Sequence, residues 1–271
     1  MLPSWTRVDG AADGCENPPV TTLAVLQARM TSTRLPGKVL LPVLDEPMVV
    51  RQIERIRRAR RVDGIVLATS TDPSDDVLAD VAGELGIGVV RGPVDDVLHR
   101  FVMAVETFEP DVVVRLTADC PLASPAVIDA VIEQFADTDV DYCSNTLTPT
   151  FPDGLDAEVV RASVLLDVAQ VSEDPAEREH VTLGVYRHPE RYRLGNHAGE
   201  RDLSGLRWTV DTADDLVFVT AVYEALYPGN PQFEMADVLA LLERQPSLSR
   251  TTAHEVRNAA LIGLDTGAMH A

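Results

Sequence analysis

Short apolar segments alternate with segments of helical periodicity along most of this 271-residue chain. The helical segments place apolar side chains at helical spacing, as Val49, Ile53 and Ile56 do. This alternation predicts an α/β fold with a Rossmann-like, open and mostly parallel sheet flanked by helices. Such a sheet binds its ligands outside the carboxyl ends of its strands. The strands are expected at 23–27, 64–68, 88–91, 111–116 and 207–210.

The remaining segments predict the helices and the limits of the domain. Between about 141 and 195, Thr-Pro, Phe-Pro and Asp-Gly steps favour a small, irregular β excursion. We expect 1–20 to be a flexible extension, 21–246 to be the domain and 247–271 to be a loosely held tail. Helices are expected at 74–85 (capped by Ser74 or Asp75), 95–108, from Ser124-Pro125 onward, 163–171, 175–186, 212–226 and 235–242.

The charge and the cysteines limit the classes of partner and compartment. The chain has 23 basic and 43 acidic residues, a formal net charge of −20, which disfavours binding to nucleic acid. Cys15, Cys120 and Cys143 are widely spaced and form no Cys-x-x-Cys pair, which fits a reducing cytoplasm better than a disulfide framework. No segment reaches the roughly 18 apolar residues of a membrane span. We therefore expect a cytoplasmic protein with neither a nucleic-acid nor a membrane partner.

The loop after the first predicted strand, residues 28–38, concentrates positive charge in this acidic chain. Arg29, Arg34 and Lys38 lie there together with three hydroxyl side chains and a Pro-Gly turn. Guanidinium forks, an ammonium group and exposed backbone N–H groups suit a polyphosphate. The spacing matches neither the Walker A loop nor the Gly-x-Gly-x-x-Gly fingerprint. A solvated basic turn is the alternative interpretation.

The same loop resembles the opening motif of the cytidylyltransferase-like family that includes SpsF-type spore coat polysaccharide biosynthesis proteins. More distantly, it is similar to the cytidylyltransferases of acylneuraminate and of the eight-carbon sugar acid KDO. These relatives share A-R-x-x-S-x-R-L-P-G-K. The resemblance implies a nucleotide-diphospho-sugar transferase-like fold and CTP as the nucleotide, with Arg34 and Lys38 on its triphosphate. The matching positions are Ala28, Arg29, Ser32, Arg34, Leu35, Pro36, Gly37 and Lys38.

Further family-like segments follow in order between about 23 and 226, and they extend the implied nucleotide site. Ala68-Thr69-Ser70 resembles the turn that faces the base, and 95–100 resembles a segment beside the nucleotide. Segments 115–122, 141–145, 151–158, 177–182 and 207–212 are also similar to SpsF-type motifs. The implied nucleotide-binding residues are Ala28, Arg29, Ser32, Arg34, Lys38, Ala68, Thr69, Ser70, Asp96, Arg100 and Arg115.

Polar residues in the irregular middle section are the candidates for binding an acceptor molecule. A solvated hairpin tip is the alternative for the acidic ones, and a half-buried core position is the alternative for the histidine. No Gly-x-Ser-x-Gly elbow or cysteine nucleophile is evident, so transfer would depend on positioning and electrostatics. The candidates are Asn145, Asp153, Asp156, Glu158 and His180.

Two aspartates follow predicted strands and are candidates for a metal site. Asp119 comes after 111–116, and Asp211 comes after 207–210. Carboxylate oxygens at one sheet edge, with phosphate oxygens and water, suit Mg²⁺. Both aspartates match metal-binding positions of the sugar-acid enzymes. Those enzymes often carry a second acid where this chain has Thr209, so the number of metal ions stays open. Helix capping is the alternative for both residues.

These features together predict a Mg²⁺-dependent cytidylyltransferase with Arg34, Lys38, Asp119 and Asp211 as its catalytic set. CTP and an anionic small molecule, such as a sugar acid bound for a polysaccharide or a specialised metabolite, would give a CMP-conjugate and pyrophosphate. Related enzymes commonly dimerise through their middle section, so the resemblance implies a homodimer.

Three other functions are weighed against this one. A sugar-phosphate nucleotidyltransferase usually has a longer, glycine-rich phosphate loop. A glycosyltransferase of the same fold generally uses an Asp-x-Asp metal motif, which neither the turn at Asp119 nor that at Asp211 supplies. A nucleotide-binding regulatory protein would not need the whole set of cations and carboxylates.

Overall fold

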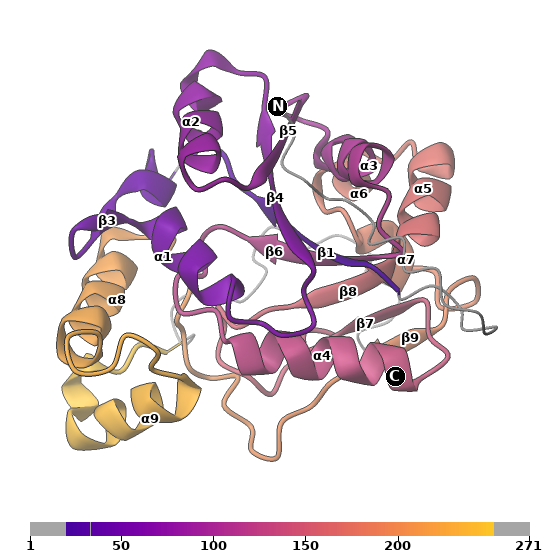
Figure 1. The fold of residues 1–271 in the computed structure, drawn as a ribbon. Helices are drawn as coiled ribbons and strands as arrows, with labels where there is room; N and C mark the ends of the chain where they lie inside the picture. The colour runs from indigo at the N-terminus through magenta and orange to yellow at the C-terminus, as the bar shows by residue number, and fades with distance from the viewer. Residues whose placement is uncertain (1–19, 33, 252–271) are drawn as a thin grey trace, which may run out of the picture.

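A computed structural model describes residues 20–32 and 34–251. Its centre is a seven-stranded sheet of order β5-β4-β1-β6-β8-β7-β9 (Figure 1). The first four strands are parallel, and β8 runs antiparallel to both of its neighbours, β6 and β7. The seven strands are β1 (Thr22–Gln27), β4 (Gly64–Ser70), β5 (Gly88–Gly92), β6 (Val112–Thr117), β7 (Tyr142–Ser144), β8 (Glu158–Arg161) and β9 (Leu194–Asn196).

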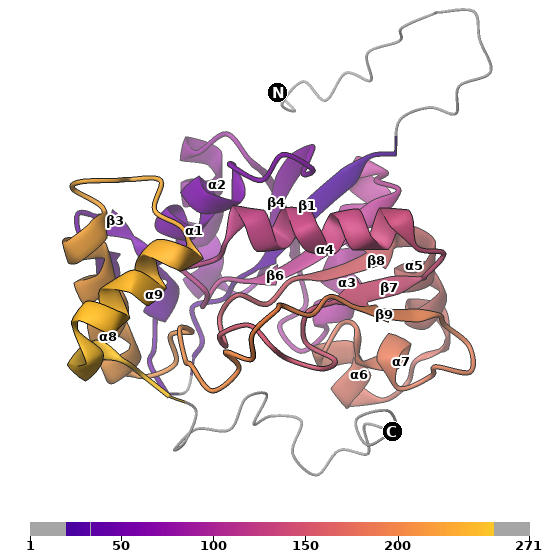
Figure 2. The ribbon, with the colours of Figure 1, turned by 90° about the horizontal axis from the view of Figure 1, so that it is seen from below.

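Helices cover both faces of the sheet, as Figures 1 and 2 show. A two-stranded ribbon of β2 (Pro42–Val43) and β3 (Glu46–Pro47) follows the 3₁₀ turn η1 (Lys38–Leu40). Two further 3₁₀ turns are η2 (Pro73–Asp75) and η3 (Pro246–Leu248). The helices are α1 (Met48–Ile56), α2 (Asp76–Glu84), α3 (Val97–Phe108), α4 (Pro125–Asp137), α5 (Ala162–Val171), α6 (Pro175–Glu179), α7 (Leu183–Tyr186), α8 (Ala213–Leu226) and α9 (Met235–Arg244).

Alternate residues of β1 serve two separate cores, as the period of a strand requires. Ala24 and Leu26 point into the core under α1, α2, α4, α8 and α9. Leu23 and Val25 point into the core under α3, α5 and α7. A strand buried on both faces reads as a continuous apolar run, and this is the reason that the sequence predicted β1 correctly.

The predicted α/β class and its parallel sheet are confirmed. Four predicted strands agree with observed ones, and the predicted and observed bounds differ by at most two residues. These are 23–27 for β1, 64–68 for β4, 88–91 for β5 and 111–116 for β6. The β segments of the middle section, β7 to β9, join the main sheet as its far edge. Among the described helices, none is both long and apolar enough to cross a membrane.

Two local predictions are wrong and a third holds only in part, because side-chain or backbone groups have distant partners. The expected helix at 175–186 breaks between α6 and α7, where the hydroxyl of Thr182 donates to the buried Glu158. No strand forms at 207–210: Arg207 makes an isolated bridge to Asp153, and the N–H of Val210 donates to the Asp119 carbonyl. Asp75 is the N-cap residue of α2, as predicted for one of two candidates, but its carboxylate makes no capping bond because it accepts from the N–H groups of Met30 and Ser70. The expectations for 1–20 and 247–271 lie largely outside the described residues.

Candidate active site

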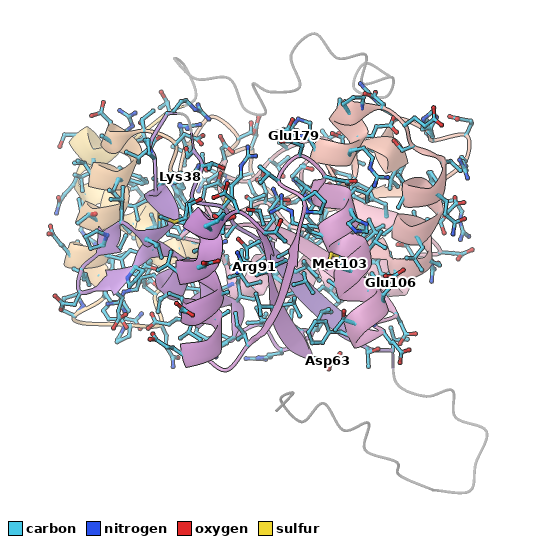
Figure 3. All side chains as sticks on the ribbon, turned by 90° about the horizontal axis from the view of Figure 1, so that it is seen from above. Lys38, Asp63, Arg91, Met103, Glu106 and Glu179 are labelled. Carbon is cyan, nitrogen blue, oxygen red and sulfur yellow. The ribbon has the colours of Figure 1, made fainter. Side chains whose placement is uncertain are left out.

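A cavity of about 360 Å³ opens at the carboxyl ends of β1 and β6. Figure 3 shows Lys38 and Glu179 at this end of the sheet and Asp63, which precedes β4, at the opposite end. The walls come from the loop after β1, the start of α3, the turn after β6, the corner between α6 and α7, and Asp211. The lining residues are Gln27, Ala28, Arg29, Thr31, Ser32, Arg34, Lys38, Val39, Val97, Arg100, Thr117, Ala118, Asp119, Glu179, His180 and Asp211.

Backbone contacts shape the basic loop that forms one wall. The carbonyl of Met30 accepts hydrogen bonds from the N–H groups of Ser32 and Gly37, so the loop turns back on itself. Gly37 has a φ of 69°, a left-handed conformation that glycine adopts without the strain a Cβ would cause. Lys38 follows at once and begins η1. The Pro-Gly turn of the sequence therefore aims the Lys38 side chain into the cavity.

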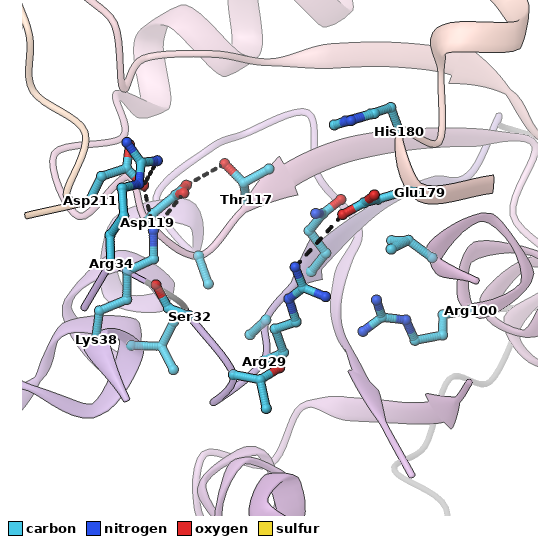
Figure 4. Close-up of a pocket in the computed structure, with 16 residues that line it drawn as sticks. Arg29, Ser32, Arg34, Lys38, Arg100, Thr117, Asp119, Glu179, His180 and Asp211 are labelled. Atoms are coloured by element: carbon cyan, nitrogen blue, oxygen red, sulfur yellow. Dashed lines mark hydrogen bonds and ion pairs between the residues drawn. The ribbon is translucent and has the colours of Figure 1, made fainter. Parts of the chain in front are cut away.

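The ammonium group of Lys38 lies among three oxygens. Its Nζ donates to Asp119 Oδ2 at 3.0 Å, to Asp211 Oδ1 at 2.9 Å and to the Val210 carbonyl at 2.8 Å. Figure 4 shows the Lys38 side chain beside the two aspartates. Burial alone would lower the pKa of Lys38, but the carboxylates of Asp119 and Asp211 outweigh it and raise the pKa above its usual value. Lys38 therefore stays charged in this setting.

Both aspartates are held in place by further contacts. Burial would raise the pKa of Asp119, but Lys38 and the Thr117 hydroxyl outweigh it and lower the pKa. Asp211 pairs through Oδ1 with Arg34 at 2.9 Å and through Oδ2 with Arg207 at 2.8 Å. These contacts keep Asp119 ionised and hold the Asp211 side chain in place at the edge where a parallel sheet binds ligands.

Helix capping, the alternative interpretation of these aspartates, is excluded because other residues cap the helices. Ser124 caps α4 by accepting from the Val127 N–H. Thr212 caps α8 and forms a reciprocal capping box with Asp215. The two aspartates are therefore left to face Lys38.

Arg100 of α3 differs from the other cavity cations. Its side chain is 2% exposed, and neither Nε nor Nη1 has a hydrogen-bond partner among the described residues. Burial and the nearby Arg29 lower its pKa. The side chain packs against Gly92, where a Cβ would lie 2.9 Å from Arg100 Cγ. Because unsatisfied buried donors are costly, this guanidinium is a strong candidate for a ligand contact.

The α6–α7 corner closes the other side of the cavity (Figure 4). Arg29 Nη2 lies 3.8 Å from Glu179 Oε1, so this ion pair links the basic loop to the corner. Burial is the largest cause that lowers the pKa of His180. A neutral imidazole there can both donate and accept a hydrogen bond.

Several predicted nucleotide-binding residues lie away from the cavity wall. Ala68, Thr69 and Ser70 are buried in β4. The carboxylate of Asp96 accepts from Arg178 Nε at 3.0 Å and also caps α3. Among the predicted nucleotide contacts, the cavity is lined by Ala28, Arg29, Ser32, Arg34, Lys38 and Arg100.

The predicted acceptor residues fall mostly into buried networks; His180 is the one that lines the described cavity. The Asn145 amide joins the Leu155 carbonyl to the Ala157 N–H. Asp153 pairs with Arg207 at 3.2 Å, and Asp156 is half-buried outside the cavity wall. The alternative of a solvated hairpin tip does not fit Asp153, which is buried.

Glu158 forms the largest of these networks. It pairs with Arg115 and accepts hydrogen bonds from the hydroxyls of Tyr142 and Thr182. Arg115 Nε in turn donates to Gln27 Oε1 at 3.1 Å. Both members of the Arg115–Glu158 pair are therefore tied to the protein behind the cavity, although both had been expected to contact ligands.

The sequence reasoning missed other lining residues. Gln27 and Thr117 are the last residues of β1 and β6 and pair in register. The rule that ligands bind at strand ends would have found both. Glu179 precedes His180, but only the break after α6 brings it to the cavity. Thr31, Val97 and Ala118 lie in segments that the sequence singled out without naming them as contacts, and Val39 follows the basic loop directly.

Comparison with known proteins decides the family. A family described as "Cytidylyltransferase" matches residues 23–219. The chain belongs to the cytidylyltransferase family. It is therefore a nucleotidyltransferase. Its similarity to the spore coat polysaccharide biosynthesis protein SpsF of Bacillus subtilis is 35% identity, covering 83% of this chain and 95% of that protein. The family resemblance found in the sequence is confirmed.

Other relatives agree with this cytidylyltransferase membership. A 3-deoxy-manno-octulosonate cytidylyltransferase of Chloroherpeton thalassium is 30% identical over 48% of this chain and 52% of its own length. A solved cytidylyltransferase of Leptospira borgpetersenii superposes with a TM-score of 0.81 at 29% identity, covering 85% of this chain and 97% of that one. A solved CMP:2-keto-3-deoxy-manno-octonic acid synthetase complexed with CTP, at 18% identity and a TM-score of 0.58 over 76% of this chain and 99% of that one, shares the fold.

Proposed function

We propose that this cytidylyltransferase transfers CMP from CTP to an anionic small molecule, such as a sugar acid, with the help of Mg²⁺. The observation that carries the proposal is one cavity that combines two kinds of group. Paired cations and carboxylates (Arg34, Lys38, Asp119 and Asp211) occupy one end. The other end holds Arg100, whose Nε and Nη1 find no hydrogen-bond partner in the part of the chain that the structure describes.

The nucleotide would lie along the cavity from one end to the other. Arg34 and Lys38 provide charge-assisted contacts for the triphosphate. Arg100 can only donate hydrogen bonds, and cytosine presents adjacent acceptors at O2 and N3. Uracil carries a hydrogen at N3, and a purine is larger. The buried guanidinium therefore supports CTP over the other three nucleotides.

The donor set fits a hard divalent cation. Two carboxylate oxygens and a backbone carbonyl already converge on one positive charge, the Lys38 ammonium. Oxygen donors of this kind are those that Mg²⁺ prefers. Asp119 and Asp211 would hold the ion. When bound, it would stabilise the charge that develops on the leaving pyrophosphate.

The acceptor would enter beside the α6–α7 corner. A hydroxyl of the acceptor gives up its proton to water or to the neutral imidazole of His180, and its oxygen forms a bond to the α-phosphorus of CTP while the bond from that phosphorus to pyrophosphate breaks. Arg29 offers a positive charge for an acidic acceptor, and His180 offers a neutral imidazole for a hydroxyl. Relatives named 3-deoxy-manno-octulosonate cytidylyltransferase support a sugar acid in this place.

The test is pyrophosphate release together with the mass of the product. The purified full chain is incubated with Mg²⁺, each of the four nucleotides, and a panel of sugar acids and sugar phosphates. We expect release with CTP and a sugar acid, and a product heavier than the acid by one cytidylyl group. A product formed from a sugar phosphate, or equal release with all four nucleotides, would overturn the proposal. The Asp211→Asn variant controls for contaminating activity.

A further inference from the structure

Lys38 occupies the place of a cation in a site made of oxygens. All three donors of its ammonium group are used, by Asp119, Asp211 and the Val210 carbonyl. Two carboxylates that share one Nζ at 3.0 and 2.9 Å are necessarily close together, and without a positive charge between them they would repel. The lysine therefore holds the pair together in the ligand-free protein.

The other partners of these carboxylates are anchored elsewhere, so Lys38 and Arg34 are the cations that a ligand could displace. Asp119 Oδ1 accepts from Thr117, and Asp211 Oδ2 accepts from Arg207, which is 3% exposed. The Arg34 side chain, by contrast, is 53% exposed. Lys38 ends in a flexible four-carbon stem, so its ammonium can move without unpacking the core.

Composition gives an independent reason to single out this residue. Lys38 is the only lysine among the 23 lysine and arginine residues of the chain. A guanidinium is a planar fork suited to two parallel bonds, whereas an ammonium is a compact charge with three donors. Three oxygens around one point match the ammonium. This position thus uses the one basic side chain that fits such a site.

We propose that Lys38 is the internal counter-ion of the metal-binding carboxylates and positions them until a divalent cation displaces it. One part rests on the proposed function: after displacement, the ammonium group of Lys38 would bind the triphosphate. Metal and nucleotide would accordingly bind with positive cooperativity, and by linkage each would raise the affinity of the other by the same factor.

The first test measures Mn²⁺ binding to the full chain without nucleotide, by the electron paramagnetic resonance signal of free Mn²⁺. Lys38→Met removes the competing charge and keeps a chain of similar length. We expect it to bind Mn²⁺ at least about tenfold more tightly than the wild type, because a unit charge at this distance is worth more than that factor. Equal or weaker binding would overturn the proposal.

A matched variant separates the local effect from the change in net charge. Arg244 is exposed at the end of α9, far in the sequence from every cavity residue. Arg244→Met changes the net charge by the same amount, and we expect its Mn²⁺ affinity to equal that of the wild type. An equal gain in both variants would assign the effect to net charge and overturn the proposal.

The single lysine allows a second test in the unmutated protein. Lysine labelled with ¹⁵N at Nζ gives one ammonium signal from the chain. Its shift should change in proportion to metal occupancy as Mg²⁺ is added without nucleotide. Metal binding that leaves this signal unmoved would overturn the proposal even if Lys38→Met fails to fold. Neither test needs turnover. If both tests give the expected results but no cytidylyl transfer is found, the proposed function is wrong and the inference about Lys38 still holds.

Discussion

The charged side chains at the two ends of the cavity differ in whether they are already paired. At one end, Lys38 and Arg34 are already paired with Asp119 and Asp211. At the other end, Arg100 is almost fully buried, and two of its nitrogens have no partner among the described residues. A ligand at the first end must exchange partners, whereas a ligand at the second end supplies partners that are missing.

This difference predicts where binding energy comes from. A ligand that binds at the paired end must replace the ion pairs that Lys38 and Arg34 already make. Its net affinity is therefore favourable only if it brings negative charge for the cations and a metal ion for the carboxylates. At the unpaired end, the cost of desolvating Arg100 is already included in the stability of the protein. Removing a group from the paired end should therefore change mainly metal binding and turnover, whereas removing Arg100 should weaken CTP binding without lowering stability.

The largest effect is expected at the paired end. Asp211→Asn keeps the shape but removes an anionic ligand of the proposed metal site, so turnover should fall at least about 100-fold and the Mg²⁺ requirement should rise. Asp119→Asn should behave alike, and the double variant should be little worse, because residues that act as a unit are non-additive. The measurement is a Mg²⁺ titration of pyrophosphate release. Unshifted metal curves in both single variants would remove these residues from the site.

The buried network around Glu158, which does not line the cavity, provides the reference. Glu158→Gln leaves the buried Arg115 without its counter-charge, so the free energy of unfolding should fall by about 2 kcal/mol. The affinity for CTP should stay unchanged, because Glu158 lies behind the cavity wall. Urea unfolding and calorimetric titration with CTP measure the two quantities. A stable variant with altered ligand affinity would return Glu158 to the acceptor site.

Arg100→Met should weaken CTP binding without lowering the stability of the protein. It removes the contact proposed between this guanidinium and the base, so we expect CTP to bind about tenfold more weakly. The melting temperature should equal or exceed that of the wild type, because an apolar side chain replaces a buried, incompletely paired charge. Thermal unfolding with and without CTP measures both effects. A large loss of stability with unchanged CTP affinity would make Arg100 a structural residue.

The smallest effect is expected for the exposed cation. Arg34→Met removes an ion pair that is open to solvent, so the melting temperature should change by less than one degree or so. Turnover should still fall several-fold, because the guanidinium faces the phosphates in the proposed complex. Steady-state kinetics with varied CTP provides the test. Normal turnover and an unchanged KM for CTP would reduce Arg34 to a surface ion pair.

The parts of the fold set by local pattern could be predicted from the sequence. The buried strands β1, β4 and β6 read as apolar runs, and the strand-end rule correctly brought Lys38 and Asp119 to one edge. Asp211 lies at the same edge although the strand predicted before it, 207–210, does not form. The structure of the middle section depends on distant partners. Glu158 is buried because Arg115, Tyr142 and Thr182 satisfy it from three other segments, and no local signal reveals that network.

The same limit explains the missed Glu179. Its place at the cavity follows from the break after α6, and that break depends on the Thr182 contact with Glu158. Asp75 likewise carries a helix-start signal, but its carboxylate is taken by the N–H groups of Met30 and Ser70. Side chains that can cap a helix can also bind a distant loop, and only the fold decides between the two.

Nucleotide selectivity tests the central claim most directly, because it needs both ends of the cavity at once. Calorimetric titration of the wild type with each of the four nucleotides, in the presence of Mg²⁺, gives their dissociation constants. The account predicts that CTP binds at least about tenfold more tightly than UTP, ATP or GTP, and that Arg100→Met removes most of this preference. Equal affinity for the four nucleotides in the wild type would contradict it.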